Sequence, residues 1–438
     1  MLDLIGGLGN ISKIPELQKR ILYTFLLLIV YRIGAHVPTP GIDTAALAAY
    51  FEQAKGSLLG LFDMFAGGAL SNLSVFALGI MPYISASIIL QLLTIAIPHL
   101  EKLSKEGEAG RRKITQYTRY GTVLLSIIQG FGIAIGLENM AGPTGISIVL
   151  EPGWAFRLMT MITLTAGTSF IMWLGEQITE KGIGNGISLI IFAGIVCRAP
   201  QAIISTFQLL SAGEMGIFSI IILTAMMLAV VGTIVFVESA QRRIPVQYAK
   251  RVVGRKIYGG QSTHLPLKVN TAGVIPPIFA SSIIMFPATI ANFIPHPWMK
   301  VVADTLVPGK AVYELMYVAF IVFFCYFYTA VTFNPVDVAD NMKKYGGYVP
   351  GIRPGKKTAD YIDEVLTRLT FSGAIYVSAV CVLPSILIGY FNVPFYFGGT
   401  ALLIVVGVAL DTAGQIETHL LTRQYEGFMK KGKIARRR

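Results

Sequence analysis

IFSIIILTAMMLAVVGTIVFV, residues Ile217–Val237, contains no charged side chain and has the length of a membrane helix. A bilayer core of ~30 Å needs ~20 consecutive apolar residues in helical form. Ten apolar runs of this kind divide the chain. A soluble core has no use for ten such runs, so the sequence predicts an all-α polytopic membrane protein with ten transmembrane helices. The runs are Ile21–Val37, Ser74–Ile97, Tyr120–Leu137, Phe156–Leu174, Ile183–Ala199, Ile217–Val237, Ala272–Phe293, Tyr313–Phe333, Thr370–Phe391 and Phe397–Ile416.

The composition agrees with this interpretation. Of the 438 residues, 54% are hydrophobic and only 14% are charged, whereas soluble domains carry about 25% charged residues. A net charge of +12 would suggest nucleic acid as a partner of a soluble protein. In a membrane protein the excess belongs to cytoplasmic loops, so we expect no direct DNA binding.

The positions of the basic residues predict the orientation. Of the 36 Lys and Arg residues, 30 lie in the N-terminal segment, in alternate loops and in the C-terminal tail. Short loops rich in Lys and Arg remain on the cytoplasmic side. We therefore expect a multi-pass protein of the bacterial inner (plasma) membrane with both termini in the cytoplasm. The other six basic residues are expected outside: Arg32, Lys55, Arg157, Arg198, Lys300 and Lys310.

Catalytic motifs are not found. GIRPGKKT (Gly351–Thr358) is one residue too short for a phosphate loop and has Lys357 at the Ser/Thr position. The five histidines are scattered, and the three cysteines lie in apolar runs without metal-like spacing. We therefore predict neither an enzyme nor a cofactor or metal site.

Charged residues inside the predicted spans are almost absent. Ion-coupled transporters keep such residues for function, although each costs ~2.5–3.5 kcal/mol on insertion scales. Their scarcity favours a passive conduit. A secondary transporter of small solutes remains the alternative, because such proteins also use broken helices and inverted repeats.

Ten spans divide naturally into two halves of five. We assign residues 1–206 to an N-terminal half with helices 1–5, and residues 207–438 to a C-terminal half with helices 6–10 and a basic tail. An odd number of spans in each half would place the halves in inverted orientation.

One apolar segment is too short to cross the membrane. LLGLFDMFAGGALSNL (Leu58–Leu73) lies on the external side and contains a Gly pair. Broken backbone at membrane depth persists only where protein or a water-filled cavity surrounds it. The segment is therefore either a half-inserted element that lines or blocks a pore, or an amphipathic helix on the outer surface.

Two cytoplasmic loops, about 238–270 and 334–369, are long, basic and interleaved with Tyr and Pro. Length, aromatic content and charge together favour the docking of a large acidic or nucleic-acid-bearing partner. Contact with anionic lipid is the alternative.

Several long strings resemble the SecY family, which forms the pore of the bacterial protein-conducting channel. They are AGGALSNLSVFALGIMPYISASIILQLL (Ala66–Leu93), EGEAGRRKITQYTRYGT (Glu106–Thr122), WLGEQITEKGIGNGISLIIFAGIV (Trp173–Val196), QSTHLPLKVNTAGVIPPIFASSI (Gln261–Ile283), YVPGIRPGKKTADYIDEVLTRLT (Tyr348–Thr370) and VPFYFGGTALLIVV (Val393–Val406). The resemblance runs in order over nearly the whole chain.

This resemblance implies two pseudo-symmetric inverted halves around an hourglass pore that opens sideways between the second and seventh spans. Its narrowest part, the pore ring, would consist of Ile80, Ile84, Ile187, Ile191, Ile278 and Ile404. Isoleucine is apolar and stiff at χ1, so a ring of isoleucines is a narrow collar that resists water and ions.

The resemblance also implies a plug, a lateral gate and docking residues. The plug, about 61–73, would include Phe62, Met64, Phe65, Gly67 and Gly68. Polar contacts of the lateral gate would be Ser87, Gln91, Asn270, Ser281 and Ser282. Docking of the motor or the ribosome would use Arg242, Arg243, Lys250, Arg255 and Arg353.

The implied function is to pass unfolded secretory polypeptides across the membrane and to release membrane segments laterally into the bilayer. The implied partners are SecE-type and SecG-type small membrane subunits, the SecA ATPase, the ribosome, secretory polypeptides with signal sequences, and membrane lipid.

Overall fold

Each of the ten predicted apolar runs coincides with a helix in the computed structural model. The structure describes residues 14–53, 63, 66–138, 148–211, 216–248, 251–253, 256–258, 262–293, 305–306, 310–391 and 399–435. Within these residues, seven helices are long and apolar enough to cross a membrane, or eight if one bent pair counts as a single span. The remaining runs correspond to helices that are shorter or more polar.

Residues 1–206 contain five of the ten helices that match predicted runs, and three further helices accompany them. The five are α2 (Pro15–Gly34), α5 (Met81–Ala96), α7 (Glu108–Glu138), α8 (Trp154–Lys181) and α9 (Gly186–Val196). The others are α3 (Thr44–Gln53), α6 (Pro98–Lys105) and α10 (Ala199–Ser211).

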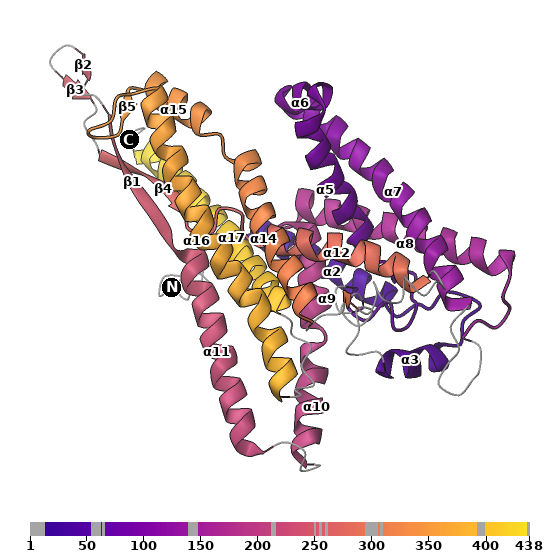
Figure 1. Ribbon diagram of the computed structural model, residues 1–438. Coiled ribbons are helices and arrows are strands. Elements are labelled where there is room, and N and C mark those ends of the chain that lie inside the picture. Colours follow the sequence, from indigo (N-terminus) through magenta and orange to yellow (C-terminus); the bar gives the residue numbers. More distant parts are fainter. Residues whose placement is uncertain are drawn as a thin grey trace.

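Residues 207–438 contain the other five helices that match predicted runs. They are α11 (Ile217–Ser239), α12 (Ile275–Phe293), α14 (Ala311–Thr332), α16 (Lys356–Phe391) and α17 (Gly399–Ala435), with the short helix α15 (Pro335–Lys344) between α14 and α16. In Figure 1, α5, α7 and α8 lie to one side and α14, α16 and α17 to the other, with α2, α9 and α12 between them.

The second predicted span begins later than its hydropathy suggests. Residues 74–80 form turns and a bridge, and the helix α5 starts only at Met81. Pro82 lies in the first turn of α5, where its fixed φ and missing N–H are tolerated. Gly79 has φ +56°, a conformation that a helix does not accept. The prediction of a regular helix from Ser74 is therefore wrong for its first turns.

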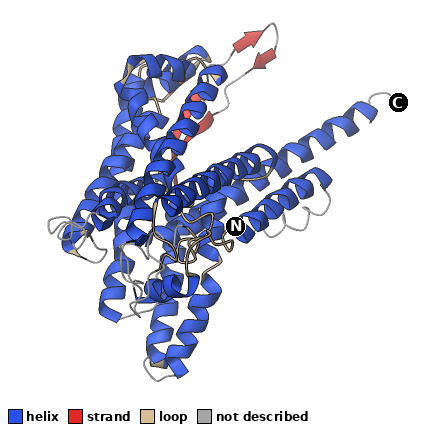
Figure 2. Cartoon of the chain, turned by 90° about the vertical axis from the view of Figure 1, so that its right-hand side faces the viewer, coloured by secondary structure: helices blue, strands red, loops and turns tan. Residues whose placement is uncertain are grey.

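Five short strands accompany the helices within the described residues. Strand β1 (Gln241–Tyr248) pairs antiparallel with β4 (Ser262–Lys268), from Gln241 opposite Lys268 to Gln247 opposite Ser262. The short strand β5 (Gly347–Tyr348) joins the other edge of β1. Strands β2 (Arg251–Val253) and β3 (Lys256–Tyr258) form a separate hairpin. In Figure 2 the strands lie at one end of a predominantly helical molecule.

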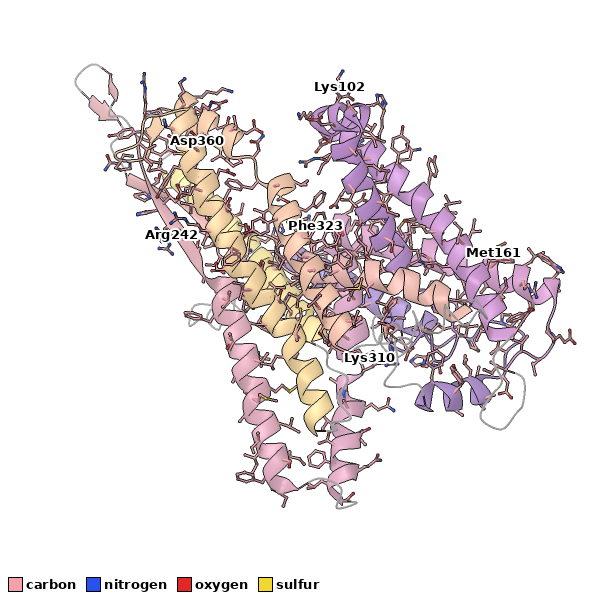
Figure 3. The ribbon with its side chains drawn as sticks, in the orientation of Figure 1. Lys102, Met161, Arg242, Lys310, Phe323 and Asp360 are labelled. Atoms are coloured by element: carbon pink, nitrogen blue, oxygen red, sulfur yellow. The ribbon has the colours of Figure 1, made fainter. Side chains whose placement is uncertain are left out.

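The two loops predicted to dock a partner fold together. Strands β1, β4 and β5, helix α15 and the first turns of α16 share a small hydrophobic core, and we call this unit the loop subdomain. Its core residues are Ile244, Val246, Leu267, Met342, Val349, Ile362 and Leu366. Lys102 on α6 and Asp360 on α16, from different halves, lie at the same end of the molecule as this unit (Figure 3).

Truncation of Ile362 tests whether this core holds the two loops together. Its side chain is fully buried, so Ile362→Ala should destabilise the subdomain by ~2–5 kcal/mol through lost contacts and the cavity left behind. We expect proteases to cut strand β4 markedly faster in the purified variant. Val336→Ala, at a residue 56% exposed on α15, should leave the rate unchanged. Equal rates in the two variants would contradict a shared core.

A larger hydrophobic cluster joins both halves of the protein. It contains buried residues from α2, α5, α7, α8 and α9 as well as from α11, α12, α14, α16 and α17. Close helix packing depends on small residues, as at Gly186, where a Cβ would lie 2.0 Å from the carbonyl oxygen of Gly175 on α8.

Candidate functional site

The six predicted ring isoleucines come from four helices of both halves. Ile80 immediately precedes α5 and Ile84 lies in its first turn. Ile187 and Ile191 are one turn apart on α9, and a residue pair with this spacing shares one helix face. The last two are Ile278 on α12 and Ile404 on α17.

All six side chains belong to the large hydrophobic cluster. Ile80, Ile84, Ile191 and Ile404 are buried in it, and Ile187 and Ile278 are partly buried against it. The structure therefore brings the predicted residues into one contiguous apolar region. Apolar side chains there offer no hydrogen bonds to water or ions.

The start of α9 is held in place by polar contacts. The side chain of Asn185 accepts hydrogen bonds from the backbone N–H groups of Ile187 (3.1 Å) and Ser188 (3.4 Å), which is an N-cap. The N–H of Gly184 donates to Oε1 of Gln415 on α17 at 3.0 Å. These contacts fix the ring residues of α9 relative to the helix that carries Ile404.

The two helices predicted to form the lateral gate, α5 and α12, are in contact. Their polar residues bond locally instead of across this contact. Gln91 donates to Ser87 on the same helix at 3.4 Å. Ser281 and Ser282 both donate to the carbonyl oxygen of Ile278, at 2.9 and 2.7 Å.

Asn270 has different hydrogen-bond partners from Ser87 and Gln91. Its Nδ2 donates to Oε1 of Glu238 at the end of α11 (2.7 Å) and to the carbonyl oxygen of Gly273 (3.1 Å). The amide oxygen accepts from the N–H of Gly273 at 3.1 Å. Asn270 therefore joins α11 to the turn before α12, a role that the sequence prediction did not include.

The described part of the predicted plug is a turn packed inside the protein. Gly67 and Gly68 have φ values of +66° and +86°, which favour glycine. A Cβ on Gly67 would lie 2.8 Å from Cα of Gly194 on α9. Phe62, Met64 and Phe65 lie outside the described residues.

Three of the predicted docking residues are exposed on the loop subdomain. Arg242 and Arg243 lie on β1, and Arg353 lies in the turn between β5 and α16. Thr358 donates a 3.0 Å hydrogen bond to the backbone carbonyl of Arg353, so the turn is held without using the arginine side chain. Lys250 and Arg255 lie outside the described residues.

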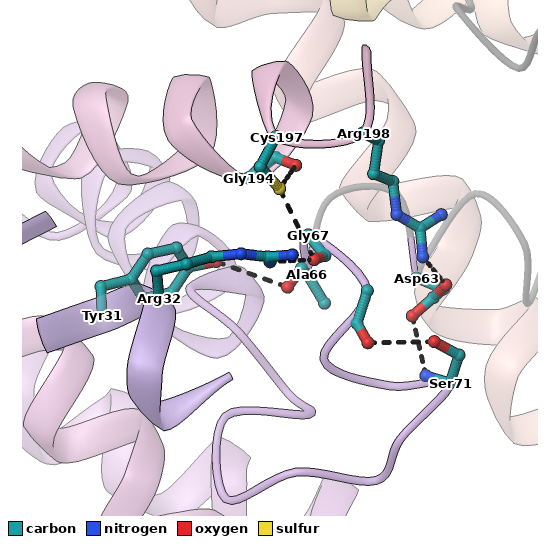
Figure 4. A network of polar contacts seen from close by, with 10 residues as sticks. Tyr31, Arg32, Asp63, Ala66, Gly67, Ser71, Gly194, Cys197 and Arg198 are labelled. Carbon is teal, nitrogen blue, oxygen red and sulfur yellow. Dashed lines mark hydrogen bonds and ion pairs between the residues drawn. The ribbon is translucent and has the colours of Figure 1, made fainter. Parts of the chain in front are cut away.

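Sequence reasoning missed several polar residues around the Gly pair. Arg32 on α2 and Arg198 both bind the plug segment, Arg32 at Gly67 and Arg198 at Asp63 (Figure 4). A signal was present, because Arg32 and Arg198 are basic residues on the side where basic residues are rare. Their partners could not be read from the sequence, since Asp63 and Arg198 are 135 positions apart.

Comparisons with known proteins agree on one family. The family model described as SecY matches residues 74–413. The chain is 54% identical to the protein translocase subunit SecY of Escherichia coli K12, over 98% of this chain and 96% of that protein. It is 48% identical to the protein translocase subunit SecY of Aquifex aeolicus, over 97% of this chain and 99% of that protein.

Solved structures share the fold at low sequence identity. A structure described as a protein-conducting channel matches with a TM-score of 0.63 and 17% identity, covering 93% of this chain and 96% of that one. A structure from a study of the plug domain of SecY matches with a TM-score of 0.63 and 19% identity, with the same coverage. The predicted fold class is thereby confirmed.

Proposed function

The chain belongs to the SecY family and is a protein-conducting subunit of a protein translocase, and we propose that polypeptides pass through a constriction formed by its six ring isoleucines. One observation carries this assignment. All six isoleucines belong to one hydrophobic cluster, four of them buried in it and two packed against it. A collar of stiff apolar side chains resists ions by excluding water and makes no hydrogen bond that would retain a passing chain.

The halves and the gate have assigned roles in this proposal. Residues 1–206 and 207–438 are the two inverted halves, and α5 and α12 separate to release membrane segments sideways. Local hydrogen bonds at Ser87, Gln91, Ser281 and Ser282 leave the contact between these helices mainly apolar. An apolar signal sequence can then pack against one of these helices in place of the other.

The plug segment closes the same path from the side opposite to the basic loops. Its described turn is packed against α2 and against α9, the helix that carries Ile187 and Ile191. The glycines at 67 and 68 give it a backbone that can bend away without side-chain clashes.

The loop subdomain is the docking surface for the partner that drives transport. Its exposed arginines, Arg242, Arg243 and Arg353, suit an acidic or nucleic-acid-bearing partner, and its own core keeps them in a fixed arrangement. We propose a SecA-type ATPase and the ribosome as these partners, and SecE-type and SecG-type subunits in the membrane. The chain itself is proposed to perform no chemistry.

The multi-pass protein is proposed to lie in the bacterial inner membrane with both termini in the cytoplasm, because the basic loops and the basic tail share one side. The comparisons give no support to the alternative of a secondary transporter for small solutes.

Site-specific crosslinking to a stalled secretory chain tests the constriction. We expect photoreactive residues at Ile84 or Ile191 to crosslink to the stalled polypeptide, because both positions face the proposed path. A photoreactive residue at Leu228, which is 68% exposed on α11, should react with lipid instead. Crosslinks from Leu228 as strong as those from Ile84 and Ile191, or none from either ring position, would place the path elsewhere.

A further inference from the structure

Two arginines at the sparsely charged end of the molecule bind the same short segment. Arg32 is in the last turn of α2, and Arg198 follows the C-terminal end of α9. Both helices end there, away from the basic loops. Charged groups beside an apolar bundle are costly unless they are paired, so their shared target calls for an explanation.

Asp63 is the acidic partner of Arg198. Its carboxylate is almost fully buried, with the side chain 6% exposed, and one of its oxygens forms an ion pair with Nη2 of Arg198. The other oxygen accepts a 2.8 Å hydrogen bond from the N–H of Ser71. Its backbone carbonyl accepts from the N–H of Gly68 at 2.9 Å. Asp63 therefore holds Gly68 and Ser71 of the turn, and Arg198 supplies the positive charge that a buried carboxylate requires (Figure 4).

Arg32 holds the same turn from the other side. Its Nη1 donates to the carbonyl oxygen of Gly67 at 2.8 Å, and the neighbouring Tyr31 hydroxyl donates to the carbonyl oxygen of Ala66 at 3.4 Å. The guanidinium of Arg198 also lies over Gly68, where a Cβ would be 3.1 Å from Nη2. The turn is thus seated between α2 and α9 by two cations.

The two ends of the segment are held by different forces. After the turn, the N–H of Thr39 donates to the carbonyl oxygen of Leu73, and the N–H of Val75 donates to that of Val37, each at 2.9 Å. This downstream end is fixed by backbone pairing, whereas side-chain charges fix the upstream end. The upstream end is therefore the part that can be released without breaking the backbone bridge.

We propose that Asp63, Arg198 and Arg32 form a charge latch that holds the plug segment closed and must separate before the segment can leave its seat. This inference rests on the proposed plug function and adds the residues that set the stability of the closed state. Arg198 has a side chain that is 37% exposed, so water and an arriving polypeptide can reach the pair and compete for the guanidinium.

Resting ion conductance of the reconstituted translocase complex in planar bilayers tests the latch. Arg198→Gln and Asp63→Asn should each raise the resting conductance, by ~10-fold if the closed state loses about 1.4 kcal/mol. Arg198→Lys keeps a cation and should preserve the seal. The double variant should leak no more than Arg198→Gln alone, because the two residues act through one shared interaction.

The Glu138–Arg157 ion pair is the matched control. It also joins a largely buried carboxylate to an arginine in the N-terminal half, at 2.6 Å, between the end of α7 and the start of α8. Glu138→Gln breaks this pair without touching the plug segment and should leave the resting conductance unchanged. A leak in this control equal to that of Arg198→Gln would overturn the latch, since any lost ion pair would then produce it.

Measurements of protein level and of the export of ordinary precursors distinguish failure of the latch from failure of the proposed channel function. Unchanged resting conductance in Asp63→Asn and Arg198→Gln, with normal export, would reject the latch and leave the channel function intact. If Arg198→Gln fails to assemble, the resting conductances of Asp63→Asn and Arg198→Lys still test the latch. The first variant removes the charge pair and should leak, whereas the second keeps the pair and should not. Failure of the proposed function itself would appear as missing crosslinks between the ring and a stalled chain.

Discussion

Replacement of Ile84 and Ile191 by serine is expected to make the resting channel leak ions. Each isoleucine is buried in the apolar cluster, and burial of such a side chain is worth about 1.5–3 kcal/mol. Serine is shorter and offers a hydroxyl to water, so the double change lowers the barrier to hydration. If about 3 kcal/mol of that barrier is lost, conductance should rise roughly 100-fold. The measurement is single-channel or bulk conductance in planar bilayers without substrate.

Two controls separate this effect from general loosening of the helices. Leu228→Ser, at an exposed position of α11, changes an isoleucine-sized apolar residue to serine away from the ring and should not leak. Ile84→Val and Ile191→Val keep an apolar, β-branched side chain and should leak far less than the serine pair. Unchanged conductance in the serine double variant, at normal protein levels, would remove these residues from the constriction.

The helical architecture could be predicted from the sequence because hydropathy directly reflects the environment of a membrane helix. Each predicted run coincides with a helix, but several helices extend far beyond their run, as α16 does by starting at Lys356 instead of Thr370. Hydropathy marks where the bilayer ends and is silent on where the hydrogen-bonded helix ends. The turns before Met81 were missed for the same reason, since residues 74–80 are apolar without being helical.

The loop subdomain could not be predicted as one unit. Its strands β1 and β5 lie about a hundred positions apart in the chain, as the bond between Tyr348 and Gln247 illustrates. Alternating apolar residues such as Ile244 and Val246 indicate a strand, but no local pattern indicates which partner covers them.

The ring was predicted only through resemblance to a family, because an isoleucine in an apolar run carries no local signal of function. Polar partners were the least predictable part of the site. Asn270 was predicted at the lateral gate, and its hydrogen bond to Glu238 could not be foreseen from the sequence. The partner of Arg198 follows from tertiary packing of a turn against α9, which no spacing rule in the sequence describes.

Reversal of charge at Arg353 is expected to impair motor-driven export more strongly than the insertion of membrane segments. The side chain is exposed on a turn whose backbone is held by Thr358, so Arg353→Glu should leave the fold intact. It places a carboxylate where an acidic surface of the motor is proposed to dock. Like charges at an interface slow association and weaken binding, and a loss of about 1.4 kcal/mol corresponds to a ~10-fold drop in motor-driven export.

Insertion of Leu-rich membrane segments should fall much less in the same variant. Such segments are proposed to leave between α5 and α12, which are in contact, and their partition into lipid follows from their own apolar surface. Arg112→Glu makes the same change in net charge at an exposed position of α7 in the other half. If it impairs export as strongly as Arg353→Glu, the effect comes from overall charge and the docking assignment is wrong. Equal loss of export and insertion in Arg353→Glu would instead indicate that the loop subdomain no longer folds, because a docking defect alone spares the lateral path.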